Sequence, residues 1–86
     1  MEIKVFKFDG IEGEIKSLNE FLKEFAPAGY GVKEKTFLEE RILCLCQGKT
    51  NYYTVNPGDA IVIKEDAQNN KFVMKLDKYD IQKLSD

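Results

Sequence analysis

The spacing of apolar residues along the chain changes between segments, and the first segment has a period of two. From Glu2 to Phe8 β-branched and aromatic residues dominate, with Ile3 and Val5 on one face of an extended segment and Phe6 and Phe8 on the other. Because both faces are apolar, the pattern predicts a strand that is covered, at least in part, on both sides.

After Glu14 the apolar residues follow the period of a helix. Successive spacings of three, four and three residues place them on one stripe, made of Ile15, Leu18, Leu22 and Phe25. We therefore predict an amphipathic helix over about residues 15–25 that lies across one face of a sheet. Ser17 and Glu20 have the spacing of a capping box, so the helix is predicted to begin at Ser17 or one turn earlier. Residues 26–29 (APAG) are predicted to end it.

The rest of the chain consists of strand-like segments separated by turns. The predicted strands are Tyr30–Leu38, Arg41–Gln47, Asn51–Val55, Ala60–Lys64 and Lys71–Leu76. The segment RILCLCQ is the most apolar and is predicted to be central. A short helix is predicted over residues 77–84, with Asp77 as its N-cap and with Leu76 and Ile81 as a hydrophobic staple.

A turn at residues 56–59 (NPGD) organises these segments. Pro57 fixes its own φ, Gly58 tolerates a positive φ, and Asp59 can accept hydrogen bonds from nearby amides. With strand-like residues on both sides, this turn predicts a β-hairpin at the centre of a small sheet. The whole pattern predicts a single α+β domain over residues 1–86, with a small curled antiparallel sheet (a partial barrel or roll) of about five to six strands.

Composition and charge exclude several classes of protein. With 43% hydrophobic residues the 86-residue chain can bury one core, and 13 basic against 15 acidic residues leave a net charge of −2. Arg41 is the single arginine, and this balance argues against duplex nucleic-acid binding. No apolar run has the length of a signal peptide or a membrane span, so we expect a cytoplasmic protein that does not bind membranes. Two cysteines are too few for a disulfide framework and fit a reducing compartment.

The chain lacks the residues that most catalytic and metal sites require. It contains no histidine, which removes the commonest general base and most zinc sites. Its acidic pairs fall in predicted turns or at a helix start, so we expect no catalytic residue, no cofactor and no metal. Cys44 and Cys46 are two apart on a strand and face the same side. They are interpreted as small buried hydrophobes; half of a metal site, completed by a second chain, is the alternative.

Aromatic and basic residues in the second half of the chain suggest a ligand site instead. Tyr52 and Tyr53 should lie on opposite faces of one strand, so that one enters the core and the other is exposed. An exposed tyrosine beside Lys49, with Arg41 on the preceding strand, can stack on a base and neutralise a phosphate; an ordinary surface aromatic is the alternative. Lys64 and Lys71 flank the last hairpin, where they either bind a ligand or keep an edge strand soluble. The candidate ligand-binding residues are Arg41, Lys49, Tyr52, Tyr53, Lys64 and Lys71.

From end to end the chain resembles a family of small accessory proteins encoded by tailed phages and prophages. The matching stretches are Ile3–Gly10, Asn19–Phe25, Arg41–Gly48, Pro57–Ile63 and Lys71–Tyr79. The match in Pro57-Gly58-Asp59 is close, whereas Ala60 replaces a tryptophan or tyrosine of the family and Leu76 replaces a proline. The resemblance implies the fold and a phage origin, and it transfers no catalytic residue.

These observations together predict a non-catalytic phage protein that acts by stoichiometric binding in an infected bacterial host. The leading hypothesis is a counter-defence protein that sequesters a small nucleotide-type immune signal. Because a pocket of several hundred Å³ is hard to build inside one small core, the protein is expected to be a homo-oligomer with the site between subunits. The alternatives are a protein-binding inhibitor of a host defence or CRISPR effector, and a minor virion component.

Overall fold

The computed structural model describes the backbone of residues 2–85 and their side chains except those of residues 37, 40, 41 and 82–85. Its elements are β1 (Glu2–Lys7), α1 (Glu14–Phe25), β2 (Tyr30–Phe37), β3 (Glu40–Gln47), β4 (Thr50–Val55), β5 (Ala60–Glu65), β6 (Lys71–Leu76) and α2 (Lys78–Ser85). Each predicted helix and strand is therefore present, with ends that differ by a few residues. The protein belongs to the α+β class, as predicted. Within residues 2–85 no helix is both long enough and apolar enough to cross a bilayer.

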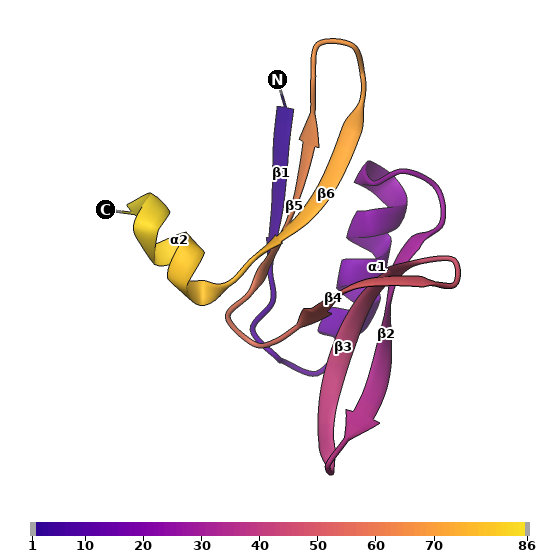
Figure 1. The fold of residues 1–86 in the computed structure, drawn as a ribbon, viewed down its shortest axis with the longest axis vertical. Coiled ribbons are helices and arrows are strands. Elements are labelled where there is room, and N and C mark those ends of the chain that lie inside the picture. The colour runs from indigo at the N-terminus through magenta and orange to yellow at the C-terminus, as the bar shows by residue number, and fades with distance from the viewer. Residues whose placement is uncertain (1, 86) are drawn as a thin grey trace.

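The strands form two antiparallel sheets of three strands each, not one curled sheet. The first has the order β1-β5-β6 and the second the order β2-β3-β4 (Figure 1). β3 is central in the second sheet, as its apolar sequence predicted. In Figure 1 α1 lies on one side of the first sheet, next to β2, and α2 projects on the other side. The partial barrel or roll was wrong in that the sheets do not close on each other.

The turn at residues 56–59 connects the two sheets, so the predicted central hairpin was wrong. Within the turn, the Asp59 amide donates to the Asn56 carbonyl over 2.9 Å. The end of β1 meets the same turn, because the Phe8 amide donates to the Asp59 carbonyl (2.8 Å) and the Gly58 amide donates to the Phe8 carbonyl (2.7 Å). These bonds place β5 beside β1 and leave β4 with β3. Local sequence predicted the turn correctly but did not predict that β5, the strand after it, pairs with β1.

One core is shared by α1 and both sheets. The most deeply buried side chains come from α1 (Leu18, Leu22), from the second sheet (Leu45, Val55) and from the first (Ile61). The stripe predicted for the helix therefore does face the core. Burial of five such side chains contributes about 1.5–3 kcal/mol each to the free energy of folding before the loss of chain entropy is counted.

The helix α1 begins one turn before Ser17, the earlier of the two predicted starts, but the predicted capping box is not formed. The helix begins at Glu14 after Gly13, whose φ of +91° is in the left-handed region, so Ser17 already lies inside the first turns. Instead of a side chain that caps the helix, the Glu14 carboxylate accepts hydrogen bonds from the amides of Ile11 (2.6 Å) and Asp9 (3.1 Å). This carboxylate holds the loop between β1 and α1 against the helix. The predicted N-cap of the second helix is confirmed, because the Asp80 amide donates to Asp77 Oδ1 over 2.8 Å.

One face of the first sheet is exposed along β1 and at Phe72, whereas Ala60 and Val62 of β5 on the same face are buried. Ile3 and Val5 are 52% and 59% exposed, and Phe72 on β6 is exposed on the same face. Phe6 and Phe8 point to the opposite face, where α1 and the core lie. The prediction that β1 is covered on both sides was therefore wrong. We call the exposed side, which carries Ile3, Val5 and Phe72, the outer face.

Candidate functional site

A β-bulge brings two neighbouring tyrosines of β4 to the surface. In the pairing of β3 with β4, Leu45 lies opposite Tyr53 but Cys46 lies opposite Asn51, so Tyr52 is the extra residue. A bulge interrupts the alternation of faces along a strand. Tyr52 and Tyr53 are accordingly 47% and 39% exposed, and neither enters the core. The expectation that one of them would be buried was wrong for this reason.

A third tyrosine completes an aromatic surface, which we call the tyrosine cluster (Tyr30, Tyr52 and Tyr53). The rings of Tyr30 and Tyr52 are stacked, with centroids 5.8 Å apart and planes at 21°, and the Tyr53 ring lies 6.5 Å from that of Tyr52. Tyr30 is half-buried against the core at the start of β2. Burial, and then the neighbouring Tyr52, raise the pKa of the Tyr30 phenol above its usual value.

Gln47 supports Tyr52 in the tyrosine cluster. The Tyr52 hydroxyl donates to Gln47 Oε1 over 3.2 Å, and Gln47 Nε2 donates to the Ala28 carbonyl over 3.0 Å. The Gly48 amide also donates to the Gly29 carbonyl over 3.3 Å. The loop after α1 and the turn between β3 and β4 are thus joined beneath the rings. This support favours a single arrangement of the aromatic surface before any partner binds.

The other predicted binding residues are spread over the molecule. Lys49 lies exposed in the turn between β3 and β4, next to the tyrosine strand. Arg41 is at the opposite end of β3, about 20 Å from Gln47 at roughly 3.3 Å per residue, and its side chain lies outside the described part of the chain. Lys64 and Lys71 belong to the first sheet. The structure therefore groups only the two β4 tyrosines with the Lys49 turn.

Sequence reasoning missed Tyr30, and no local signal could have found it. Its place beside Tyr52 depends on the pairing of β2 with β3, in which Tyr30 lies opposite Gln47. It also depends on the bulge that turns Tyr52 toward it. Both are relations between segments that are distant in sequence, which an apolar period does not encode.

A separate cavity of about 540 Å³ lies between the β1–α1 loop and the second sheet. Apolar side chains form much of its wall: Phe8, Ile11, Ile15, Leu43, Val55 and Pro57. Among the described residues, the charged ones that line it are Glu12 and Glu34. None of these lining residues belongs to the tyrosine cluster, so the cavity and the cluster are separate features.

The cysteines behave as predicted for small core residues. Cys44 and Cys46 are both buried free thiols on β3. The Cys46 thiol lies 3.5 Å from the Gly31 carbonyl, which accepts its weak hydrogen bond. Among the described residues, no three His, Cys, Asp or Glu side chains are grouped closely enough to hold a metal ion.

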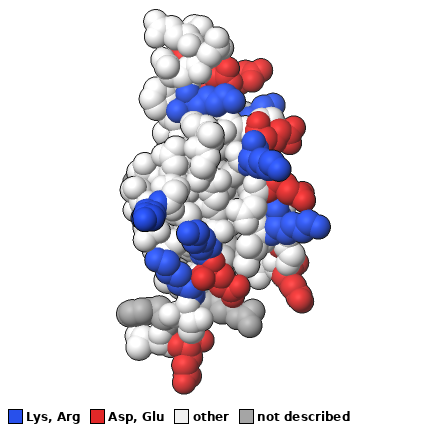
Figure 2. All heavy atoms as spheres, turned by 90° about the vertical axis from the view of Figure 1, so that its right-hand side faces the viewer, with Lys and Arg blue, Asp and Glu red and all other residues white. Residues whose placement is uncertain are grey.

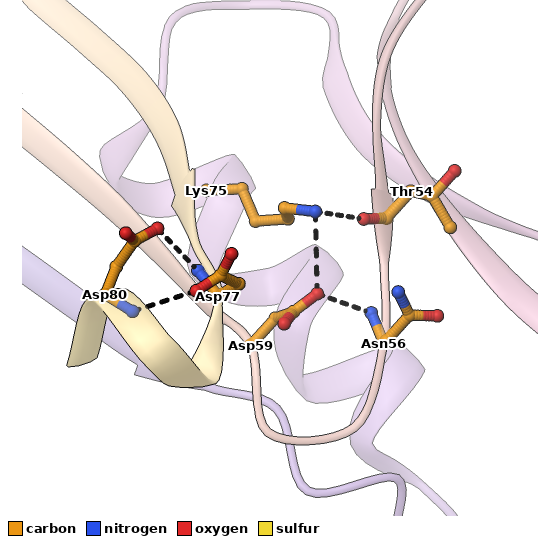
Figure 3. A network of polar contacts seen from close by, with 6 residues as sticks. All are labelled: Thr54, Asn56, Asp59, Lys75, Asp77 and Asp80. Atoms are coloured by element: carbon orange, nitrogen blue, oxygen red, sulfur yellow. Dashed lines mark hydrogen bonds and ion pairs between the residues drawn. The ribbon is translucent and has the colours of Figure 1, made fainter. Parts of the chain in front are cut away.

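The one buried charged side chain that the described residues contain is part of the structural frame (Figure 3). Asp59 is only 4% exposed, and its Oδ2 accepts a hydrogen bond from the Asn56 amide over 2.8 Å. The same oxygen lies 3.7 Å from Lys75 Nζ, which also donates to the Thr54 carbonyl over 3.0 Å. Lys75 thus links β6 of the first sheet to β4 of the second. Among the described residues no buried side-chain nitrogen or oxygen lacks a hydrogen-bond partner, and these contacts tie the turn to both sheets.

Charge on the α1 side of the molecule is mixed. Figure 2, which views the right-hand side of Figure 1, shows basic and acidic side chains alternating beside a broad uncharged area. No continuous basic area appears in this view, and a duplex ligand would require one. Comparisons of the chain with family models, with curated proteins and with solved structures gave no match.

Proposed function

We propose that this protein is a non-catalytic accessory protein that binds another protein stoichiometrically through the tyrosine cluster. The observation that carries the proposal is the group of three neighbouring tyrosine rings, of which Tyr52 and Tyr53 are well exposed and Tyr52 is bonded to Gln47. Tyrosine is enriched at protein interfaces because a large ring buries much area at a small cost in side-chain entropy, while its hydroxyl keeps a polar contact. The resemblance to phage accessory proteins suggests a host defence protein or CRISPR effector as the partner.

Affinity purification with a matched pair of variants tests this proposal. Tagged wild type, the double variant Tyr52→Ala/Tyr53→Ala and the control Tyr79→Ala are incubated with bacterial lysate, and retained proteins are quantified by mass spectrometry. Tyr79 is a good control because it is exposed on α2, away from the cluster. We expect a partner that wild type and control retain equally and that the double variant loses at least tenfold.

Reconstitution from purified components then decides the stoichiometry. The identified partner should form a 1:1 complex with wild type that survives gel filtration, and circular dichroism should show that the double variant is folded. Equal retention of all proteins by the three baits, or a folded double variant that still forms the complex, would contradict the proposal.

Sequestration of a small nucleotide-type signal is the second candidate, favoured by the stacked rings and by Lys49. The exposed Tyr52 ring offers a stacking surface for a base, and Lys49 lies in the adjoining turn. Thermal shift measurements with cyclic dinucleotides and ADP-ribose derivatives, together with native mass spectrometry of freshly purified protein, test it. A shift that disappears in both Tyr52→Ala and Lys49→Ala supports this function. It is excluded if no compound raises the melting temperature and no ligand is retained.

A further inference from the structure

The free edge of β1 presents a regular set of backbone donors and acceptors. The amide and the carbonyl of Phe8 both bond toward the β5 side, to Asp59 and Gly58. Along an antiparallel pair, residues bonded to the partner alternate with residues whose backbone groups point away. The even-numbered residues of β1 therefore bond to β5, and Ile3, Val5 and Lys7 direct their amides and carbonyls to the other side. Within residues 2–85, no strand pairs with that side.

We propose that β1 pairs antiparallel with β1 of a second copy of this chain, with Val5 opposite Val5. Only registers that match odd-numbered residues with odd-numbered residues bring the free groups together. The register centred on Val5 pairs Ile3 with Lys7 of the second copy and Lys7 with its Ile3. It uses the six free groups of each copy in six hydrogen bonds, whereas a shift of two residues in either direction leaves two bonds fewer. The first sheet (β1-β5-β6) of one copy and the first sheet of the other then join into one sheet across a two-fold axis.

Side chains are compatible with this register. No two like charges are directly opposite each other, because Lys7 faces Ile3 and Lys4 faces Phe6. The two Lys4 residues are diagonal neighbours, but each ammonium lies 5.2 Å from the centre of the Phe25 ring in its own copy. On the outer face the Val5 side chains of the two copies meet, and valine beside valine favours strand pairing.

The choice of a second copy, and not a foreign strand, follows from this self-complementarity. Three strands of six residues span about 20 Å by 14 Å, so one outer face is smaller than the roughly 800 Å² per partner of a stable interface. Contact through the outer faces alone is therefore insufficient for a stable dimer. Pairing of the edges adds backbone hydrogen bonds and makes the two outer faces continuous, so Ile3 and Val5 come to lie at the centre of the joined sheet.

Two substitutions at one position separate the backbone contribution from the side chain. Val5→Ala and Val5→Pro both remove the valine, but only proline removes the edge amide, which does not bond to β5; an edge strand tolerates proline there. Sedimentation equilibrium of the full chain should show a dimer for wild type and Val5→Ala, and at least a tenfold larger dissociation constant for Val5→Pro. A wild type that is monomeric at 100 μM, or equal dissociation constants for the two variants, overturns the proposal.

Cysteine cross-linking tests the register without depending on the folding of the proline variant. Cα atoms of a hydrogen-bonded antiparallel pair are about 5.5 Å apart, within the range of a disulfide. Val5→Cys should therefore form an intermolecular disulfide under mild oxidation. Ile3→Cys, equally exposed on the same face, should not, because two copies of residue 3 would be roughly 13 Å apart. Equal cross-linking of both variants refutes the register. Binding through the tyrosine cluster is measured separately and does not depend on the result.

Discussion

Replacement of Asp59 by alanine removes the buried carboxylate that links the central turn to β6. The resulting loss in the free energy of unfolding has two parts. The Asn56 amide loses its acceptor, which costs about 1–2 kcal/mol for a partly buried donor. Lys75 loses its counter-ion; since its side chain is 23% exposed and keeps the Thr54 carbonyl, we expect only about 1 kcal/mol from this part. The free energy of unfolding should therefore fall by about 2–3 kcal/mol in total.

Such a loss is large for a chain of 86 residues. At about 4–8 °C per kcal/mol for a domain of 60–100 residues, the melting temperature should fall by roughly 10–20 °C. Urea unfolding followed by circular dichroism measures the free energy, and calorimetry measures the temperature. Asp9→Ala is the matched control, because this carboxylate is exposed in another turn and its removal should change the free energy by less than about 0.5 kcal/mol.

A double-mutant cycle with Lys75→Met separates the two parts. The coupling energy between Asp59 and Lys75 should be about 1 kcal/mol, because the ion pair is only partly screened by solvent. A coupling near zero would show that the 3.7 Å contact between Oδ2 and Nζ contributes nothing. An Asp59→Ala variant as stable as wild type would refute the view that this carboxylate holds the turn.

Three further predictions concern glycine, tyrosine and aspartate positions. In urea unfolding, Gly10→Ala should lower the free energy of unfolding by about 1–2 kcal/mol more than Gly48→Ala. Both glycines have a positive φ, but only at Gly10 would an added Cβ meet the Pro57 ring, at 2.9 Å. Equal costs would rule out that contact. Because burial and its tyrosine neighbours raise the pKa of Tyr30 above 10.0, the folded state holds this proton longer and stability should fall as the pH rises above about 10. An ultraviolet titration of the wild type should be completed at a higher pH than that of Tyr30→Phe; completion at the same pH is the contrary result. The amides that follow Asp66, chiefly that of Asn70, lower the pKa of its carboxyl below 3.8. The contribution of Asp66 to the free energy of unfolding is therefore present above that pH and lost as the pH falls. In denaturant melts, Asp66→Asn should reduce the loss of stability at acid pH, and an unchanged dependence on pH would contradict this.

Local sequence predicted the elements of this fold but not their partners. The period of the α1 stripe and the apolar character of β3 depend on neighbouring residues, and both predictions were confirmed. Whether β5 joins the first or the second sheet depends instead on Phe8, which is distant in sequence and bonds to the turn at residues 56–59. A turn such as residues 56–59 reverses or redirects the chain according to what packs against it, so its sequence alone favours a hairpin without requiring one.

The candidate site was predictable to the same extent. Tyr52 and Tyr53 were named as candidates because they adjoin Lys49 on one predicted strand. Their common exposure was not predicted, because a period of two assigns neighbouring residues to opposite faces and the bulge adds one residue to β4. Tyr30 required the pairing of β2 with β3, and Lys64 belongs to a sheet that the sequence did not distinguish from the other.

The division of the strands between two sheets imposes an order on synthesis. Residues 14–55 supply α1 and the whole second sheet from contiguous chain, so this part can pack while the ribosome is still translating the remainder. β1 precedes this part in the sequence but can pair with its neighbour β5 only after that segment has been made. Until then β1 lacks its sheet partner, and its Ile3, Val5 and Phe6 side chains are available to chaperones that bind exposed hydrophobic peptides.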